Sequence, residues 1–510
     1  MTLAMKRIIG GFLLVFVGVA LCTARGDDRT AAKASVGKRL VVHEWGTFTT
    51  LQDEGGNSVS GINTDDEPAP DFVHRLATQF FLDRTEMPPN FFQGAPACHP
   101  DVTMRLETPV LYFYKPKGWE GHAVDVQVKF RNGWLTEFYP KADFAAPGFD
   151  AAHPGEVYTE TSPAVTDWRG GFGRIKDGTW GELSWRGISL EGAGDGPATT
   201  EKVWLAPREV ESTPLRVAGG ESEKFLFYRG VAHNDAPLRI VRSKGQLEIH
   251  DSTWRDKQEE GRIDAAWLVD VQGDGVCAYD ALGALEEGKE IRRRAPAEFA
   301  RGAYAPKNMA ALRGEMKAAL VKEGLFKDEA DALLNTWQVS YFKSPGLRLF
   351  YICPRIEVNG LLPLEVSDGA DVTRVMMGRI ELVTPGQRAL LAKIAAGPAP
   401  KLESIPGFPS TYYASHPEVD SQTIHNVEGL YRQVMEGKRP MIALGIPIPE
   451  VYADFLKLGR FRVALLIDEE KKRPTAALKD FIRNGGFMDE DFFAQIYSRP
   501  QQPPHPGEPQ

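Results

Sequence analysis

The stretch LVVHEWGTFTT, at positions 40–50, places His43, Glu44 and Trp45 side by side after an apolar run. A histidine or a glutamate could act as a general base, and both residue types can also bind a metal ion. Successive side chains of a regular strand point to opposite faces, so His43 would share a face with Trp45 while Glu44 would take the other. We therefore expect a strand with Trp45 buried, and we keep His43 and Glu44 as separate catalytic candidates rather than as one dyad.

A group of polar side chains follows in NTDDEPAPDFVHRL, and its possible metal ligands are Asp65, Asp66, Glu67, Asp71 and His74. Oxygen ligands crowded in a loop suit a hard divalent cation such as Ca²⁺. A histidine among the ligands would shift the preference towards zinc or manganese. The spacing matches no defined metal site, so the favoured interpretation is a solvated acidic loop that caps a helix at Asp71, with a divalent metal site as the alternative.

The segment DVQGDGVCAYD, at positions 270–280, has part of the pattern of a calcium loop. Asp270, Asp274 and Gly275 fall at loop positions one, five and six, but position twelve is Ala281 instead of a bidentate acid. Apolar residues flank the segment on both sides, which favours a tight hairpin turn.

Charged residues also occur inside two strand patterns. Arg105 and Glu107 share a face in TMRLETPVLYFY, and Arg379 and Glu381 share a face in MMGRIELVTP. Because a buried charge must be paired to persist, each pair is either a structural ion pair or part of a cleft, and structure is the commoner answer. The sequence contains no GxSxG, no Walker or Rossmann glycine pattern and no cysteine in an evidently activating context.

Aromatic residues allow two interpretations. The residues Trp45, Trp134, Trp180, Trp185 and Trp204 could stack against sugar rings, which would make carbohydrate a partner. Aromatic side chains also dominate ordinary cores, and this is the favoured interpretation.

The first 24 residues are typical of an export signal. Two basic residues precede the apolar run IIGGFLLVFVGVAL, which is shorter than the roughly 20 residues of a membrane span. Cys22 and Ala24 fit the small-x-small pattern of a cleavage site. We therefore predict a signal peptide over 1–24 and an extracytoplasmic mature chain, periplasmic or secreted. A lipoprotein acylated at Cys22 is less favoured, because the residues before that cysteine lack the small residue expected next to it.

Charge and cysteine content restrict the partners. The formal charge of the chain is −9, and it becomes −9 − 2 = −11 when the two basic residues of the signal are removed. An acidic chain without a long Lys/Arg block is not expected to bind nucleic acid. The mature chain contains no second long apolar run, so we expect no membrane span in it. Cys98, Cys277 and Cys353 remain after cleavage; they allow at most one intramolecular disulfide, and their spacing does not suggest a metal site.

The order of the elements predicts an α+β fold that is predominantly β. Residues 39–295 contain many short aromatic and β-branched runs separated by turn signals, which indicates a β-sandwich-like region. Residues 300–394 mix strands with helical patterns at 311–323, 330–337 and 385–394 and form a smaller α+β region. The strands predicted there are GLRLFYICPRIEV, LLPLEV and RVMMGRIELV.

The rest of the chain is divided by composition. We predict linkers at 25–38 and 395–410, an α+β C-terminal region at 411–498 and a disordered, proline-rich tail at 499–510. The C-terminal region should contain a helix at 451–458, a strand in RFRVALLI and a helix at 474–484.

The stretch HEWGTFTTLQ resembles a group of uncharacterised exported bacterial proteins that carry HEWGTFT near the mature N-terminus. The resemblance continues in ETPVLYFY, LTEFYP, PGLRLFYICPR, LLPLEV and RVMMGRIELVTP, and so spans most of the mature chain. It implies export and one continuous architecture, but no reaction and no catalytic residues. The favoured function is an extracytoplasmic binding or scaffold protein. The alternative is a metal-assisted exported hydrolase that uses His43 or Glu44 with acids from 65–71.

Overall fold

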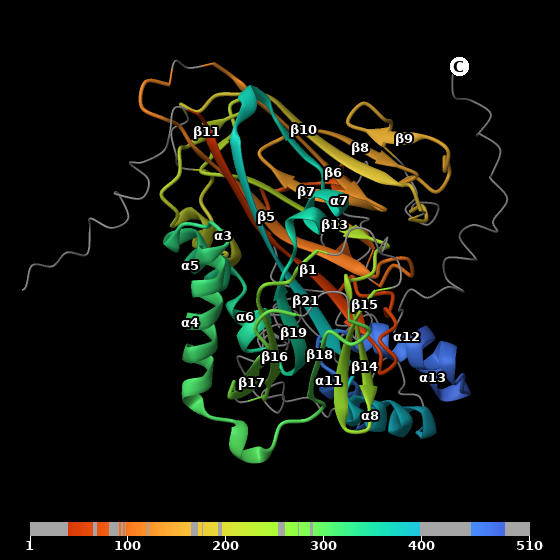
Figure 1. Ribbon diagram of the computed structural model, residues 1–510. Helices are drawn as coiled ribbons and strands as arrows, with labels where there is room; N and C mark the ends of the chain where they lie inside the picture. The colour runs from red at the N-terminus through yellow and green to blue at the C-terminus, as the bar shows by residue number, and fades with distance from the viewer. Residues whose placement is uncertain are drawn as a thin grey trace, which may run out of the picture. The chain divides into compact units, whose positions relative to one another are not determined.

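The long first strand lies inside a mixed sheet. In the computed structural model, β1 (Val41–Gln52) pairs in parallel with β21 (Asp371–Leu382) along its whole length (Figure 1). On its other side β1 pairs antiparallel with β5 (Met104–Tyr114). Residues of β1 and β5 are almost all buried, as suits strands rich in β-branched and aromatic side chains. The strand predicted over 40–50 is confirmed, and Trp45 is fully buried.

The structure describes residues 39–64, 69–80, 91–92, 95–96, 98–119, 122–164, 172–175, 177–191, 196–252, 261–273, 275–285, 289–397 and 450–484. The predicted signal peptide, the linker at 25–38 and the tail at 499–510 lie outside these residues.

Fourteen strands of the described residues form the sheet that contains β1. Their order is β17-β16-β19-β21-β1-β5-β13-β7-β10-β6-β20, with β2, β8 and β9 attached to its members. The further strands of this sheet are β2 (His74–Arg75), β6 (Val124–Arg131), β7 (Gly133–Tyr139), β8 (Asp143–Pro147), β9 (Val157–Thr159), β10 (Trp180–Ile188), β13 (Leu226–Ala232), β16 (Ala266–Val271), β17 (Cys277–Ala281), β19 (Gly346–Ile352) and β20 (Leu364–Val366). The boundary predicted at 295–300 thus falls between strands that share one sheet, since β16 and β17 precede it and β19 and β21 follow it.

Smaller sheets of two or three strands complete the β structure of the described residues. They contain β3 (Phe91–Phe92), β4 (Ala95–Pro96), β11 (Leu215–Arg216), β12 (Ser222–Glu223), β14 (Leu238–Ser243), β15 (Gln246–Asp251) and β18 (Arg293–Pro296). More of the chain is strand than helix, and the predicted α+β, predominantly β fold class is confirmed.

The helices divide between two apolar cores. The described helices are α2 (Leu76–Phe80), α3 (Lys202–Arg208), α4 (Pro306–Lys322), α5 (Lys327–Thr336), α6 (Gln338–Phe342), α7 (Arg355–Leu361), α8 (Pro385–Ala396), α11 (Glu450–Lys457), α12 (Arg462–Lys472) and α13 (Ala476–Asn484). Helices α3 to α6 contribute to the core that contains Trp45, whereas α7, α8 and α11 to α13 contribute to the core that contains Phe48. None of the helices in the described residues is long and apolar enough to span a membrane.

The core also takes up most of the tryptophans considered as sugar platforms. Trp45, Trp134, Trp185 and Trp204 are at most 1% exposed, and only Trp180 of the five is half-buried. Four of these rings therefore pack as core residues, which is the favoured of the two interpretations.

Several predicted elements are confirmed. The helical patterns at 311–323, 330–337, 385–394 and 451–458 correspond to α4, α5, α8 and α11. The hairpin interpretation of 270–280 is also confirmed, because β16 and β17 pair antiparallel across a turn in which Gly275 has a φ of 80°.

Two strand predictions were wrong. RFRVALLI leads into and forms the start of α12 instead of a strand. A run of five apolar residues does not distinguish a helix from a strand. The following DEEKK consists largely of good helix formers, which favours the helix. The strand predicted through GLRLFYICPRIEV ends at Ile352, and α7 follows. Pro354 precedes that helix at its N-cap and, having no N–H, could not have donated to a strand ladder.

The helix predicted from Asp71 was also wrong at its start. Residues His74 and Arg75 pair with β7 as the short strand β2, and the helix α2 begins only at Leu76. Pairing with the sheet overrides the helical pattern here, as tertiary contacts commonly do.

Candidate functional site

His43 and Glu44 lie on opposite faces of β1, as the strand alternation predicts. The Nδ1 atom of His43 is 2.8 Å from Oε2 of Glu329 in α5. On the other face, Glu44 accepts a hydrogen bond from Nε of Arg374 at 2.5 Å and another from the hydroxyl of Tyr228. The two candidates are therefore not brought together, and each belongs to its own buried ion-pair network.

The partner of His43 is held firmly in place. Glu329 accepts a hydrogen bond from the hydroxyl of Tyr114 at 2.6 Å and one from the backbone N–H of Phe326 at 2.6 Å. The ring of His43 also packs against the rings of Tyr114 and Phe326 at 5.3 and 4.6 Å. A carboxylate on Nδ1 favours a proton on that nitrogen and leaves Nε2 able to accept one. This pair has the arrangement of an oriented general base.

Of the five residues proposed as metal ligands, the structure describes Asp71 and His74. Asp65, Asp66 and Glu67 lie outside the described residues. Asp71 is exposed, and Nε2 of His74 lies 2.9 Å from an oxygen of Glu221. Within the described ranges, no group of three or more His, Cys, Asp or Glu residues could hold a metal ion.

The cysteines left after the predicted cleavage are separate thiols. Cys98, Cys277 and Cys353 are all buried and none forms a disulfide. Burial raises the pKa of Cys98 to about 12 and also raises that of Cys277. A thiol with a raised pKa is a poor nucleophile, so neither of these two is an activated cysteine.

The charged pairs noted in two separate strands meet beside β1. Thr49 of β1 is opposite Arg379 of β21 on one side and opposite Arg105 of β5 on the other. Residues directly opposite in paired strands point to the same face, so these three side chains form a row across three strands. Glu107 lies one step along this face, and Glu381 accepts a hydrogen bond from Nε of Arg379 at 2.6 Å.

Arg348 joins these pairs from the strand β19. Its Nε lies 3.0 Å from Oε1 of Glu381, and its other nitrogens donate to backbone carbonyls of Ser340, Tyr341 and Ser344. These carbonyls belong to α6 and the residues after it, so Arg348 fixes this helix against the sheet. The side chain is fully buried.

Arg460 joins from the turn between α11 and α12. Its Nη2 donates to Oε1 of Glu107 at 2.7 Å, while Nε of Arg105 lies 3.6 Å from the same oxygen. We call the resulting group the arginine cluster; its members are Arg105, Arg348, Arg379, Arg460, Glu107, Glu381 and Thr49.

The arginine cluster buries six ionisable side chains. Its four guanidinium groups and two carboxylates are all at most 10% exposed. Asp270 also acts on Arg348, and burial raises the pKa of Asp270. Taking charged groups out of water costs several kcal/mol per ion (order of magnitude). Burying the cluster therefore costs folding free energy.

The pKa shifts inside the cluster follow from burial and from the opposing charges. Burial lowers the pKa of Arg348 to about 10, although Glu381 acts in the other direction. Burial would raise the pKa of Glu107, but Arg460, Arg105 and Arg379 together outweigh it and hold that pKa at about 2. Glu107 is thus ionised at neutral pH, and its oxygens are hydrogen-bond acceptors only.

Several atoms of the cluster have no hydrogen-bond partner within the described part of the protein. Some of them lie in ion pairs, as Nε of Arg348 and Nη2 of Arg379 do with Glu381. The others include Nη1 of Arg379, Oγ1 of Thr49 and Oε2 of Glu107, and all three are buried. Nearly all buried polar atoms in proteins are hydrogen-bonded, so each exception needs an explanation. Nη1 of Arg379 is a donor, Oε2 of the ionised Glu107 is an acceptor, and the hydroxyl of Thr49 can donate or accept.

The backbone beside Glu107 is strained. Thr108 has a φ of 47°, which is rare for a β-branched residue, and its Oγ1 accepts hydrogen bonds from Nε and Nη2 of Arg229 at 3.1 Å each. The register of β1 against β5 shifts at Gly46, where an added Cβ would lie 3.0 Å from Cα of Pro109. Bulges and strained residues gather at functional sites, where they aim side chains.

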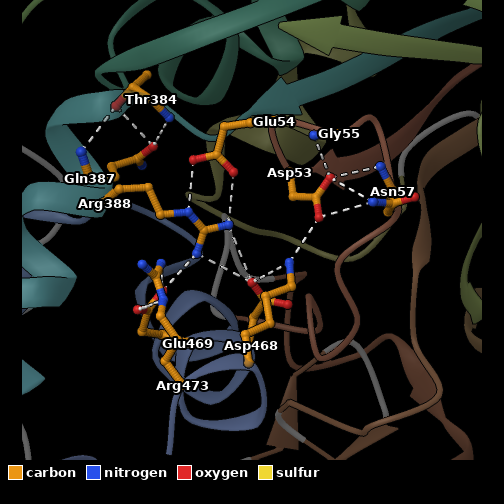
Figure 2. Close-up of polar contacts among 11 residues, drawn as sticks. Asp53, Glu54, Gly55, Asn57, Thr384, Gln387, Arg388, Asp468, Glu469 and Arg473 are labelled. Atoms are coloured by element: carbon orange, nitrogen blue, oxygen red, sulfur yellow. Dashed lines mark hydrogen bonds and ion pairs between the residues drawn. The ribbon is translucent and has the colours of Figure 1, made fainter.

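A second ion network anchors the helix that follows Arg460 (Figure 2). Arg388 of α8 donates from Nε and Nη2 to Glu54 at 2.8 and 3.0 Å, and from Nη1 to Glu469 of α12 at 3.0 Å. Lys472 of α12 donates to Asp53 at 2.8 Å. Because Asp53 and Glu54 directly follow β1, these contacts tie α12 to the end of the central strand.

Sequence patterns did not single out three members of the cluster, which are Thr49, Arg348 and Arg460. Arg348 is a lone charge inside the apolar strand GLRLFYI, and this isolation was an available signal. Arg460 lies in the GRFR stretch, where nothing local distinguishes it from a surface arginine.

The fold and the site together define a mostly β, α+β protein with a buried arginine cluster beside β1. No protein-family model matches the chain, and no curated protein sequence matches it. Among solved structures, the chain is similar to the Fcho1 Mu homology domain of Danio rerio with bound Eps15 peptide, at 7% identity. The similarity covers 69% of this chain and 97% of that chain with a TM-score of 0.25, a value too low to carry an argument about fold or function.

Proposed function

We propose that the protein is an extracytoplasmic binding protein whose ligand is a small anion held by the arginine cluster. The observation that carries this proposal is a pair of buried donors, Nη1 of Arg379 and Oγ1 of Thr49, which have no hydrogen-bond partner among the described residues. An oxyanion would supply acceptors for both of them, and its negative charge would face the guanidinium groups of the cluster. The extracytoplasmic location rests on the export signal predicted from the sequence.

A purely structural role explains the cluster less well. Replacing a buried ion network by well-packed apolar residues is often neutral or stabilising, by about 1–4 kcal/mol in the cases measured. A fold that needed only stability at this position would be served better by apolar side chains. The fork-like donor geometry of arginine, in contrast, matches planar or tetrahedral oxyanions.

The proposal is tested by melting curves of the purified mature chain in phosphate, sulfate, acetate and chloride at constant ionic strength. A ligand that binds only the folded state stabilises it by about 2.7 kcal/mol at one hundred times its Kd. We expect at least one oxyanion to raise the melting temperature in a saturable way. The effect should disappear in Arg379→Met and persist in the control Arg294→Met, whose side chain is 56% exposed.

Two results would refute anion binding at this site. One is a chain that no oxyanion stabilises beyond the effect of chloride. The other is an Arg379→Met protein that responds as the parent does. If Arg379→Met does not fold, the smaller change Thr49→Val removes one donor from the same row and should weaken the response.

Hydrolysis is the second candidate function, and the pair of His43 and Glu329 favours it. With Nδ1 held by the carboxylate, Nε2 could take a proton from water. Such a hydrolase could also use a bound metal ion, and metal analysis of the mature protein tests this. A stoichiometric transition metal that is lost in His43→Gln would support the hydrolase, whereas a metal-free chain without hydrolytic activity would argue against it.

A further inference from the structure

The further inference concerns the specificity of the arginine cluster and rests on the proposed function. One oxygen of Glu107, Oε1, is occupied by Arg460, but the buried Oε2 has no hydrogen-bond partner within the described residues. The side chain of Glu107 is fully buried, so bulk water does not reach it freely. The cluster thus presents an acceptor as well as its donors.

The residue opposite Glu107 does not donate a hydrogen bond to this oxygen. Thr47 of β1 is the register partner of Glu107, but its Oγ1 lies 2.5 Å from the hydroxyl of Tyr341. Arg229 donates two hydrogen bonds to Oγ1 of Thr108, the residue that follows Glu107. An ionised carboxylate can only accept hydrogen bonds, so the missing partner must be a donor.

Oxyanions differ in whether they can supply such a donor. Sulfate carries no proton at neutral pH and presents acceptors on every side, so one of its oxygens would face Oε2 of Glu107 and be repelled. Hydrogen phosphate keeps one proton. It can donate that proton to Oε2 of Glu107 while its other oxygens accept from Arg379 and Thr49.

We infer that the arginine cluster selects a small oxyanion that carries a proton, with inorganic hydrogen phosphate as the simplest example, and rejects fully deprotonated oxyanions such as sulfate. Glu107 is the specificity residue: it discriminates by repelling a ligand that has no donor to offer.

The experiment is isothermal titration of the full mature chain at pH 8 with four probes. Phosphate and arsenate each keep a proton at that pH, whereas sulfate and the dianion of methyl phosphate do not. We expect phosphate and arsenate to bind at least about 100-fold more tightly than the other two, since a site with a buried unpaired acceptor rejects analogues that lack the donor. Methyl phosphate distinguishes free phosphate from a phosphate ester as the ligand.

Glu107→Gln should change which oxyanions the cluster prefers. The amide of glutamine can donate a hydrogen bond, so this variant should bind sulfate and lose most of its preference for phosphate. The control Glu248→Gln, in β15 and outside the cluster, should keep the preference of the parent. The comparison of four probes on the unchanged protein stands even if Glu107→Gln does not fold.

The outcomes separate the two proposals. If no oxyanion binds, anion binding itself is refuted. If phosphate and sulfate bind equally well and Arg379→Met abolishes both, the proposed function stands and the inference about a protonated oxyanion is overturned. Tight binding of methyl phosphate and sulfate together with phosphate would overturn it as well.

Discussion

Arg460 donates a hydrogen bond of 2.7 Å to Glu107, although 353 positions separate the two residues in the chain. Glu107 lies in β5 beside the central strand, and Arg460 lies between two helices of the C-terminal segment. The arginine cluster is therefore complete only when these helices are packed against the rest of the fold. Arg388, which ties α12 to the end of β1, contributes to the same packing.

The first prediction concerns this anchor. Arg388→Met removes the paired bonds to Glu54 and the bond to Glu469, and should lower the free energy of unfolding by about 1.5–3 kcal/mol, the range for hydrogen bonds to charged groups. Urea unfolding measures it. The control Arg186→Met breaks a surface pair with Asp143 and should cost less than about 1 kcal/mol. Equal losses in both variants would mean that Arg388 is not an anchor.

The second prediction concerns pH. Burial raises the pKa of Asp53 and of Glu54, but hydrogen bonds, chiefly with Lys472 and Arg388 respectively, outweigh it and lower both. A pKa that is lowered in the folded state gives stability that is present above the unfolded values of 3.8 and 4.5 and is lost as pH falls through the folded ones. The free energy of unfolding should therefore fall on acidification below about pH 4.5. The decline should be shallower in Lys472→Met, and an unchanged slope would contradict the assignment.

The third prediction concerns the core at β1. Trp45 is fully buried between strands and helices, so Trp45→Ala should cost about 3–5 kcal/mol, the usual range for deleting a large buried aromatic side chain. Trp180→Ala, at a half-buried ring, is the matched control and should cost clearly less. Chemical denaturation of both proteins decides. A Trp45→Ala protein as stable as its parent would remove this account of the core.

The fourth prediction concerns His43. One ordinary hydrogen bond lost in His43→Gln would cost about 1 kcal/mol. The contact with the carboxylate of Glu329 raises the expected cost to about 1.5–3 kcal/mol, because the partner is a charged group in a buried position. Thermal and urea unfolding measure it. A loss well below 1 kcal/mol would show that this pair is not a stabilising contact.

The sequence carried much of this picture in local patterns. Strand alternation around His43 and Glu44 assigns them to opposite faces, which needs no knowledge of the partner strands. The same rule identifies Arg105 with Glu107, and Arg379 with Glu381, as pairs on one face. The helices α4, α5, α8 and α11 were also predictable, because their apolar positions recur at helical spacing.

What the sequence does not carry is which distant elements meet. The parallel pairing of β1 with β21 joins segments more than 300 residues apart and turns two ion pairs into one cluster, and no local pattern encodes that pairing. The contribution of Arg460 depends in turn on the packing of α12, whose apolar run had predicted a strand. Glu329 was missed for the same reason: only the tertiary fold puts its carboxylate beside His43.

The most direct test of an anion site in the arginine cluster is a crystal of the mature chain soaked in arsenate, with anomalous diffraction measured at the arsenic edge. We predict an anomalous peak within hydrogen-bonding distance of Nη1 of Arg379 and Oγ1 of Thr49, with Oε2 of Glu107 on its other side. Crystals of Arg379→Met should lack the peak. An anomalous map without a peak at these three residues, in crystals that show arsenate elsewhere, would contradict the account.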